Sequence, residues 1–138
     1  MPTAKITKIE TVKAGMNSDF FNPFGDPITL RMTINYSADI FQLPGPTVWQ
    51  TFQIIELRTN TVFEQWRFQD AIKWPVTYSW VDLPTAQGLG LDWTASDIFG
   101  FRGAVEVFSW QGEDGLVSTE AFDVSHIHWF RLAAVFGL

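Results

Sequence analysis

The chain has 138 residues, of which 46% are hydrophobic, 16% aromatic and 17% charged, and this apolar content excludes an intrinsically disordered chain. The formal net charge of −6 argues against nucleic acid and anionic membrane as partners, because both attract patches of Lys and Arg. The absence of cysteine excludes disulfides and thiolate metal sites, and no apolar run reaches the roughly 18 residues that a membrane span needs.

The first half of the chain contains the clearest strand signal. Residues 5–13 predict a first strand, and the spacing of its apolar residues by three indicates a β-bulge or a strand that switches sheets. A loop is expected over residues 14–26. Between residues 28 and 36, five apolar residues alternate with four polar ones, so one face of this strand is expected to be buried and the other exposed to solvent. Such alternation is typical of antiparallel sheets.

The rest of the chain predicts strands joined by short turns and one long crossover. The expected strands cover residues 48–57, 62–69, 76–83, 104–110 and 116–124. The first two form a hairpin around residues 58–61, and the last two form a hairpin around residues 111–115. Residues 84–102 form the crossover, in which residues 94–97 are expected to cap one helical turn that reaches Phe99.

Three segments carry a resemblance to a known fold family. The sequence GAVEVF at residues 103–108, the turn at 112–115 and TEAFDVS at 119–125 resemble the closing F–G hairpin of bacterial immunoglobulin-like and fibronectin-III-like domains. DPITL at residues 26–30 resembles their strand B. With the strand count, the resemblance implies an all-β, antiparallel immunoglobulin-like sandwich of about seven to nine strands over residues 1–125. This fold mostly serves binding and assembly.

The two histidines form the one pattern that suggests a metal. His126 and His128 stand two residues apart, which places both on one face of an extended strand, and Asp123 or a carboxylate elsewhere could be a third ligand. Known metal sandwiches of this kind need a further histidine, and the chain has no third one. We therefore expect two ordinary strand histidines, with no metal and no cofactor.

The sequence carries no strong signature of catalysis. Glu56, Glu64 and Glu106 lie in predicted strands, where a pair of carboxylates could meet across a sheet as in glycosidases. None of them sits in the Glu-x-Asp-x-Glu array that some of those enzymes carry, and there is no Gly-x-Ser-x-Gly turn for a nucleophile. We expect a protein that is not an enzyme.

Aromatic residues gather in segments that the sandwich would place at one end. The loop 14–26, the turn 58–61 and the crossover 84–102 share that end, where rings either cap the core or form a contact surface. Strand 104–110 is apolar on both faces, and the apolar extension 126–138 must pack on the same domain or on a neighbouring subunit. The candidate interface residues are Phe20, Phe21, Phe24, Trp93, Phe99, Phe101, Phe108, Trp110, Trp129, Phe130 and Phe136.

Two functions remain open from the sequence. The leading hypothesis is a non-enzymatic sandwich that associates with itself or with a protein partner through the aromatic end and the C-terminal extension. The alternative is a carbohydrate-binding module in which Trp74, Trp93 or Trp110 forms a flat platform for a sugar ring. The absence of an apolar leader after Met1 and of cysteine favours a cytoplasmic location.

Overall fold

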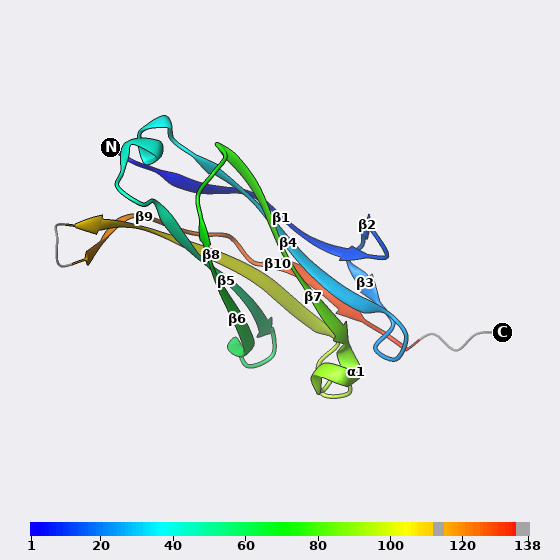
Figure 1. The fold of residues 1–138 in the computed structure, drawn as a ribbon. Helices are drawn as coiled ribbons and strands as arrows, with labels where there is room; N and C mark the ends of the chain where they lie inside the picture. Colours follow the sequence, from blue (N-terminus) through cyan, green and yellow to red (C-terminus); the bar gives the residue numbers. More distant parts are fainter. Residues whose placement is uncertain (112–114, 135–138) are drawn as a thin grey trace.

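Two β-sheets stack on each other in the computed structural model (Figure 1), which describes residues 1–111 and 115–134, the side chains of Gln111 and Leu116 excepted. A 3-10 helix covers Ala38–Gln42, and the one α-helix of the described residues is α1 (Ala86–Leu89). The strands are β1 (Ala4–Lys13), β2 (Met16–Asn17), β3 (Phe20–Phe21), β4 (Pro27–Tyr36), β5 (Thr47–Glu56), β6 (Thr61–Ala71), β7 (Val76–Thr85), β8 (Ile98–Gln111), β9 (Leu116–Val124) and β10 (His128–Leu132). The predicted β-sandwich architecture is confirmed at the level of two stacked sheets.

The sheets contain four and six strands. The four-stranded sheet has the order β2-β1-β4-β7, and the other has the order β3-β10-β8-β5-β6, with β9 pairing with β8 as well. Neighbouring strands run antiparallel except β3 and β10, which are parallel. The expectation of a purely antiparallel fold is therefore wrong for this pair. No hairpin joins β3 and β10, and the chain between residues 21 and 128 is long enough for the two strands to run in the same direction.

Strand β4 lies between β1 and β7 and shows the predicted alternation. Ile28, Leu30, Met32, Ile34 and Tyr36 are buried, whereas the four residues between them point to the other face. In β1, the pairing register with β4 shifts between Ile6 and Lys8, and this β-bulge explains the spacing of Ile6 and Ile9, whereas Val12 lies on the outer face opposite Thr29.

The crossover differs most from the prediction. Strand β7 continues to Thr85, whose side chain caps α1 by accepting a hydrogen bond from the backbone N–H of Gly88, and Gly90 ends the helix at a φ of 78°. Strand β8 begins at Ile98, six residues before the predicted start at 104. The helical turn expected from residue 94 to Phe99 is wrong, because Phe99 pairs with Glu56 in the sheet and buries its ring in the core.

The C-terminal segment adds a strand to the six-stranded sheet. Strand β10 pairs with residues 98–101 of β8, next to the part of β8 that pairs with β9. Phe130 and Leu132 point into the core and are buried. Residues 112–114 of the predicted tight turn, and Phe136 in the extension, lie outside the described residues.

The two sides of the sandwich are covered differently. On one side, β1 packs against β8, β9 and β10. On the other side, β6 and β7 are the last strands of their sheets, and the chain passes from one sheet to the other between them (Figure 1). Ten of the eleven residues of β6 are exposed, so this strand has little cover on either face. No helix in the described part of the chain has the length and apolarity of a membrane span.

Candidate ligand-binding site

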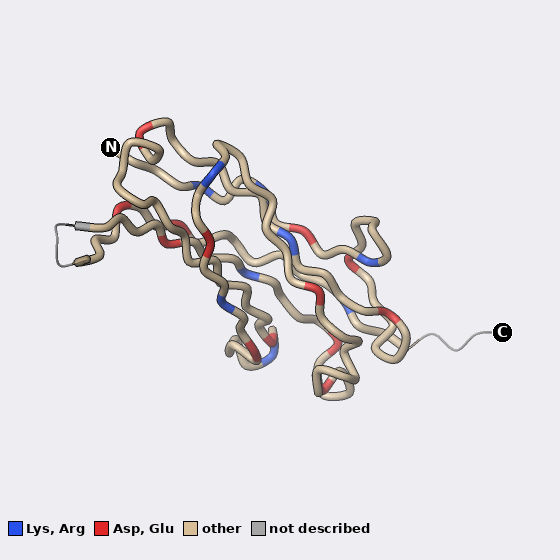
Figure 2. Tube along the Cα trace, viewed as in Figure 1, with Lys and Arg blue, Asp and Glu red and all other residues tan. Residues whose placement is uncertain are grey.

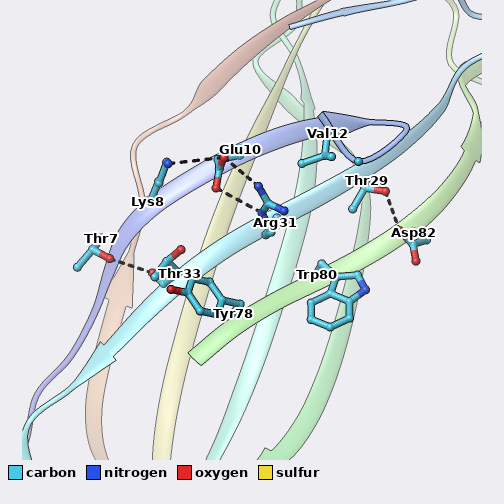
Figure 3. Close-up of a pocket in the computed structure, with 11 residues that line it drawn as sticks. Thr7, Lys8, Glu10, Val12, Thr29, Arg31, Thr33, Tyr78, Trp80 and Asp82 are labelled. Atoms are coloured by element: carbon cyan, nitrogen blue, oxygen red, sulfur yellow. Dashed lines mark hydrogen bonds and ion pairs between the residues drawn. The ribbon is translucent and has the colours of Figure 1, made fainter. Parts of the chain in front are cut away.

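A wide groove lies on the outer face of the four-stranded sheet (Figure 3), formed by strands β1, β4 and β7 and rimmed by Gly15 in the β1–β2 turn. Its volume is about 880 Å³, within the range of roughly 300–1,000 Å³ that is common for small-molecule sites. The groove combines two aromatic rings with threonine, lysine, arginine and carboxylate side chains. We take it as the candidate site because it holds apolar and polar recognition groups together.

Two aromatic side chains of β7 form the apolar part of the groove. Successive strand residues alternate between faces, so Val81 and Leu83 turn toward the core while Tyr78 and Trp80 turn outward. Tyr78 is 64% exposed and Trp80 is 58% exposed. Their positions lie about 7 Å apart along the strand, so the two rings offer adjacent contact surfaces for one extended ligand.

An ion pair between β1 and β4 forms the charged part of the groove. Arg31 donates from Nε to Oε1 of Glu10 over 3.3 Å and from Nη2 to Oε2 over 3.1 Å, and Nη2 also donates to Oδ1 of Asn17. Burial raises the pKa of the Glu10 carboxyl, but the hydrogen bonds and positive charges around it outweigh burial and hold this pKa below its ordinary value. Glu10 is therefore a carboxylate at neutral pH, and it fixes the Arg31 guanidinium in place.

Further polar groups lie along the groove. Thr29 donates from its hydroxyl to Oδ1 of Asp82 over 2.6 Å, and the ammonium of Lys8 lies 3.7 Å from Oε2 of Glu10. The groove thus contains two cationic and two anionic side chains, Lys8 and Arg31 with Glu10 and Asp82. Figure 2 shows the same mixture across the described chain, where basic and acidic positions are interspersed. The groove therefore carries no strong electrostatic preference for an anion or a cation.

The structure places the three tryptophans predicted as sugar platforms in three separate regions. Trp74 is exposed in the β6–β7 connection, and Trp110 is exposed on the outer face of the six-stranded sheet. Trp93 is half-buried and packs edge-on against Phe24, with 5.5 Å between ring centroids. None of the three lines the groove, whose rings come from Tyr78 and Trp80. The sequence of residues 77–82 places Tyr78 and Trp80 on one face of a strand, but it does not show whether that face is buried or exposed.

The candidate interface residues divide into core and surface positions. Phe21, Phe99, Phe101 and Phe130 are buried and stack on or touch one another or Phe52, so they cannot contact a partner in this fold. They are buried because the strands that carry them lie in the six-stranded sheet with these rings turned toward the other sheet. The remaining described candidates are exposed or half-buried, and they are Phe20, Phe24, Trp93, Phe108, Trp110 and Trp129.

The two histidines lie in different environments, because β10 begins at His128 and His126 precedes it. His128 belongs to β10, where Nε2 lies 2.9 Å from Oδ1 of Asp19 and 3.2 Å from Oγ1 of Thr11, whereas His126 is exposed ahead of that strand. Asp123 instead accepts a hydrogen bond from the backbone of Ile6. Among the residues that the structure describes, no group of three or more His, Cys, Asp or Glu side chains is placed to hold a metal ion.

The strand glutamates considered for paired-carboxylate chemistry lie in different environments. Glu64 pairs with Ile54 and lies on the same side of the sheet, but it is exposed because β6 is the last strand and has little cover. Glu106 lies on β8 between the inward residues Val105 and Val107, and it faces outward. These two carboxylates are therefore on opposite faces of the six-stranded sheet.

A functional conclusion for this chain therefore depends on the geometry of the groove, because comparisons with known proteins give no match. No protein-family model, no curated protein and no solved structure matches the chain.

Proposed function

We propose that the protein is a non-catalytic β-sandwich module that binds a carbohydrate chain in the groove on the outer face of its four-stranded sheet. The observation that carries this proposal is the outward placement of Tyr78 and Trp80 on one strand, beside the Glu10–Arg31 pair. A sugar ring has an apolar C–H face and a rim of hydroxyl groups, and it therefore requires an aromatic surface flanked by hydrogen-bonding side chains.

The polar side chains of the groove suit hydroxyl groups. Arg31 uses Nε and Nη2 for its partners Glu10 and Asn17, and the two N–H groups on its Nη1 atom are directed to no acceptor among the described contacts. Asp82 accepts at Oδ1 from Thr29 and has a second oxygen for a ligand donor. A sugar hydroxyl both donates and accepts, so it can use each of these groups.

Charge argues against a single-stranded nucleic acid on the same aromatic surface. Stacking platforms for nucleic acids combine aromatic rings with a positively charged groove that follows the phosphates. Here Glu10 and Asp82 offset Lys8 and Arg31, and the chain as a whole carries a net charge of −6. A neutral glycan pays no such electrostatic penalty.

Titration with neutral oligosaccharides tests the proposal. We expect cellohexaose, xylohexaose, mannohexaose or chitohexaose to give saturable heat in calorimetry and a change in tryptophan fluorescence. Trp80→Ala should weaken that binding about tenfold or more, because it removes most of the apolar contact area of the platform. Trp110→Ala is the matched control, since Trp110 is similarly exposed on the opposite sheet. Flat titrations across the panel, or an equal loss in both variants, would refute the proposal.

We also propose that the sandwich has immunoglobulin-like topology. The orders β1-β4-β7 in one sheet and β6-β5-β8-β9 in the other support this assignment. They correspond to strands A, B and E facing C, F and G, with β6 beside C as strand C′ stands in variable-type domains. An experimental structure with a different strand order would contradict it.

A protein partner is the second candidate function, and one surface favours it. Trp110, Val117, Phe122 and Val124 are exposed on the outer face of β8 and β9, where Trp110 pairs with Val117, and Phe122 and Val124 pair with Glu106 and Ala104. Several exposed apolar side chains on one face of a sheet favour a contact surface. We propose that this face mediates association with itself or with another protein, in place of the aromatic end that the sequence suggested.

Light scattering during gel filtration tests the self-association form of this second candidate. A concentration-dependent rise in mass that Phe122→Asp abolishes, and Met16→Asp leaves unchanged, is the expected result. Met16 is also exposed but lies in β2 of the other sheet. A monomeric mass over a wide concentration range would exclude self-association through this face.

A further inference from the structure

A second cavity lies between the two sheets, on the side where β6 and β7 end them. Its volume is about 410 Å³, and its walls come from β4, β5, β6, β7 and the connection from β6 to β7. Two backbone hydrogen bonds hold that connection in place, from Ile72 N–H to the carbonyl of Pro46 and from Tyr36 N–H to the carbonyl of Pro75. The cavity is therefore a built feature of the inter-sheet space, and it adjoins the groove on the outer face through Tyr78 and Trp80, which line both.

The side chain of Tyr36 lines this cavity and has an unsatisfied hydroxyl group. Tyr36 is only 6% exposed, and its hydroxyl oxygen is the one buried side-chain polar atom among the described residues without a hydrogen-bond partner. Leaving a buried polar group unpaired is unfavourable, and such groups in native proteins usually meet a water molecule or a ligand. Burial, reinforced by the charge of Asp70, raises the pKa of this hydroxyl, so it remains a protonated donor.

The neighbouring side chains supply matching polar groups. Asp70 lies in the cavity wall and accepts a hydrogen bond at Oδ2 from Nε2 of Gln50 over 2.7 Å, and Gln50 itself is almost fully buried. Thr77 and Ser79 occupy the inward positions of β7 and add two hydroxyl-bearing side chains. The exposed Trp74 stands in the lining with its indole accessible from outside.

We propose that this inter-sheet cavity is a second binding site, which takes a single neutral sugar ring or a similar polyol. Its lining offers a phenol donor, a carboxylate acceptor, an amide and two side-chain hydroxyls within one compartment. Adjacent hydroxyls of a polyol accept from Tyr36 and donate to Asp70, which satisfies the orphaned phenol. Asp70 disfavours an anion and Lys73 disfavours a cation, so an uncharged ligand fits the lining best.

Chemical-shift titration of the ¹⁵N-labelled protein with glucose, galactose, mannose, xylose and glycerol tests this site. We expect at least one of these probes to give saturable shifts in the backbone amides of Tyr36, Asp70 and Thr77. Tyr36→Phe should weaken that affinity about three- to tenfold, the usual effect of one hydrogen bond. The same variant should unfold at a higher temperature without ligand, because it removes the unpaired buried hydroxyl.

Two variants separate this site from the groove, because Asp82 lines only the groove and Tyr36 lines only the cavity. Asp82→Asn should leave the monosaccharide affinity unchanged, and Tyr36→Phe should leave oligosaccharide binding to the groove unchanged. Absence of saturable shifts with every probe, or equal affinity in Tyr36→Phe and the wild type, would overturn the cavity proposal. Neither result would alter the test of the outer groove, so the two proposals fail independently.

Discussion

The carboxylate of Asp123 on β9 accepts a hydrogen bond from the backbone N–H of Ile6 on β1, with 2.7 Å between the nitrogen and Oδ2. This contact joins the two sheets on the side that β1 closes. It also satisfies a backbone donor next to the β-bulge, where the pairing of β1 with β4 changes register.

We expect Asp123→Ala to lower the free energy of unfolding by about 1.5–3 kcal/mol, because it leaves this part-buried N–H without its charged acceptor. Urea denaturation measures the change. Asp82→Ala is the control, since Asp82 is exposed and its hydrogen bond with Thr29 lies at the surface. An equal loss in the two variants would show that the inter-sheet contact has no special role.

The Glu10–Arg31 pair predicts an acid-sensitive contribution to stability. Because the folded protein holds the pKa of the Glu10 carboxyl below its ordinary value of 4.5, the carboxylate stabilises the fold above that pH. The contribution is lost as the pH falls through the lower pKa of the folded state. Glu10→Gln should therefore be less stable than the wild type at neutral pH and approach it in acid.

Thermal unfolding at a series of pH values measures the Glu10 effect. Glu64→Gln is the matched control, because Glu64 is exposed on β6. A constant difference between wild type and Glu10→Gln from neutral pH to strong acid would contradict the assigned role of the ion pair.

Neighbouring residues of β10 should differ strongly in their contribution to stability. Phe130 is 2% exposed, with ring centroids 5.8 Å from Phe21 and 6.3 Å from Phe99. We expect Phe130→Ala to cost about 3–5 kcal/mol through lost burial and the resulting cavity. Trp129→Ala should cost only about 1 kcal/mol, since Trp129 lies on the outer face. Equal costs in chemical denaturation would mean that β10 does not pack on the core as described.

Two glycines should differ in their tolerance of a methyl group. A Cβ at Gly100 would overlap Cγ2 of Ile127 and lie 2.9 Å from the ring of Trp129, so Gly100→Ala must displace these two side chains. We expect a loss of about 1–3 kcal/mol in thermal unfolding, as in other overpacked sites. Gly25→Ala, with no heavy atom within 4 Å of the added Cβ, should be close to neutral. A neutral Gly100→Ala variant would contradict the close approach of β10 to β8.

Local patterns in the sequence were sufficient for most of the strands. The alternation of residues 28–36 predicted β4, the two hairpins appear as β5–β6 and β8–β9, and the irregular spacing of residues 5–13 appears as the β-bulge of β1. These features depend on side-chain period and turn chemistry within a few residues, so they can be read without knowing the rest of the fold.

Only the tertiary structure decided which aromatic residues are buried and where a ligand can bind. Phe99 and Trp80 both belong to strands, yet Phe99 faces the other sheet, whereas Trp80 faces outward on the last strand of its sheet. The two-residue period of a β-strand makes successive side chains point to opposite faces. Which of these faces becomes the core depends on the distant strand that covers it. The groove beside Tyr78, the orphaned hydroxyl of Tyr36 and the parallel pair of β3 and β10 all arise from such long-range packing.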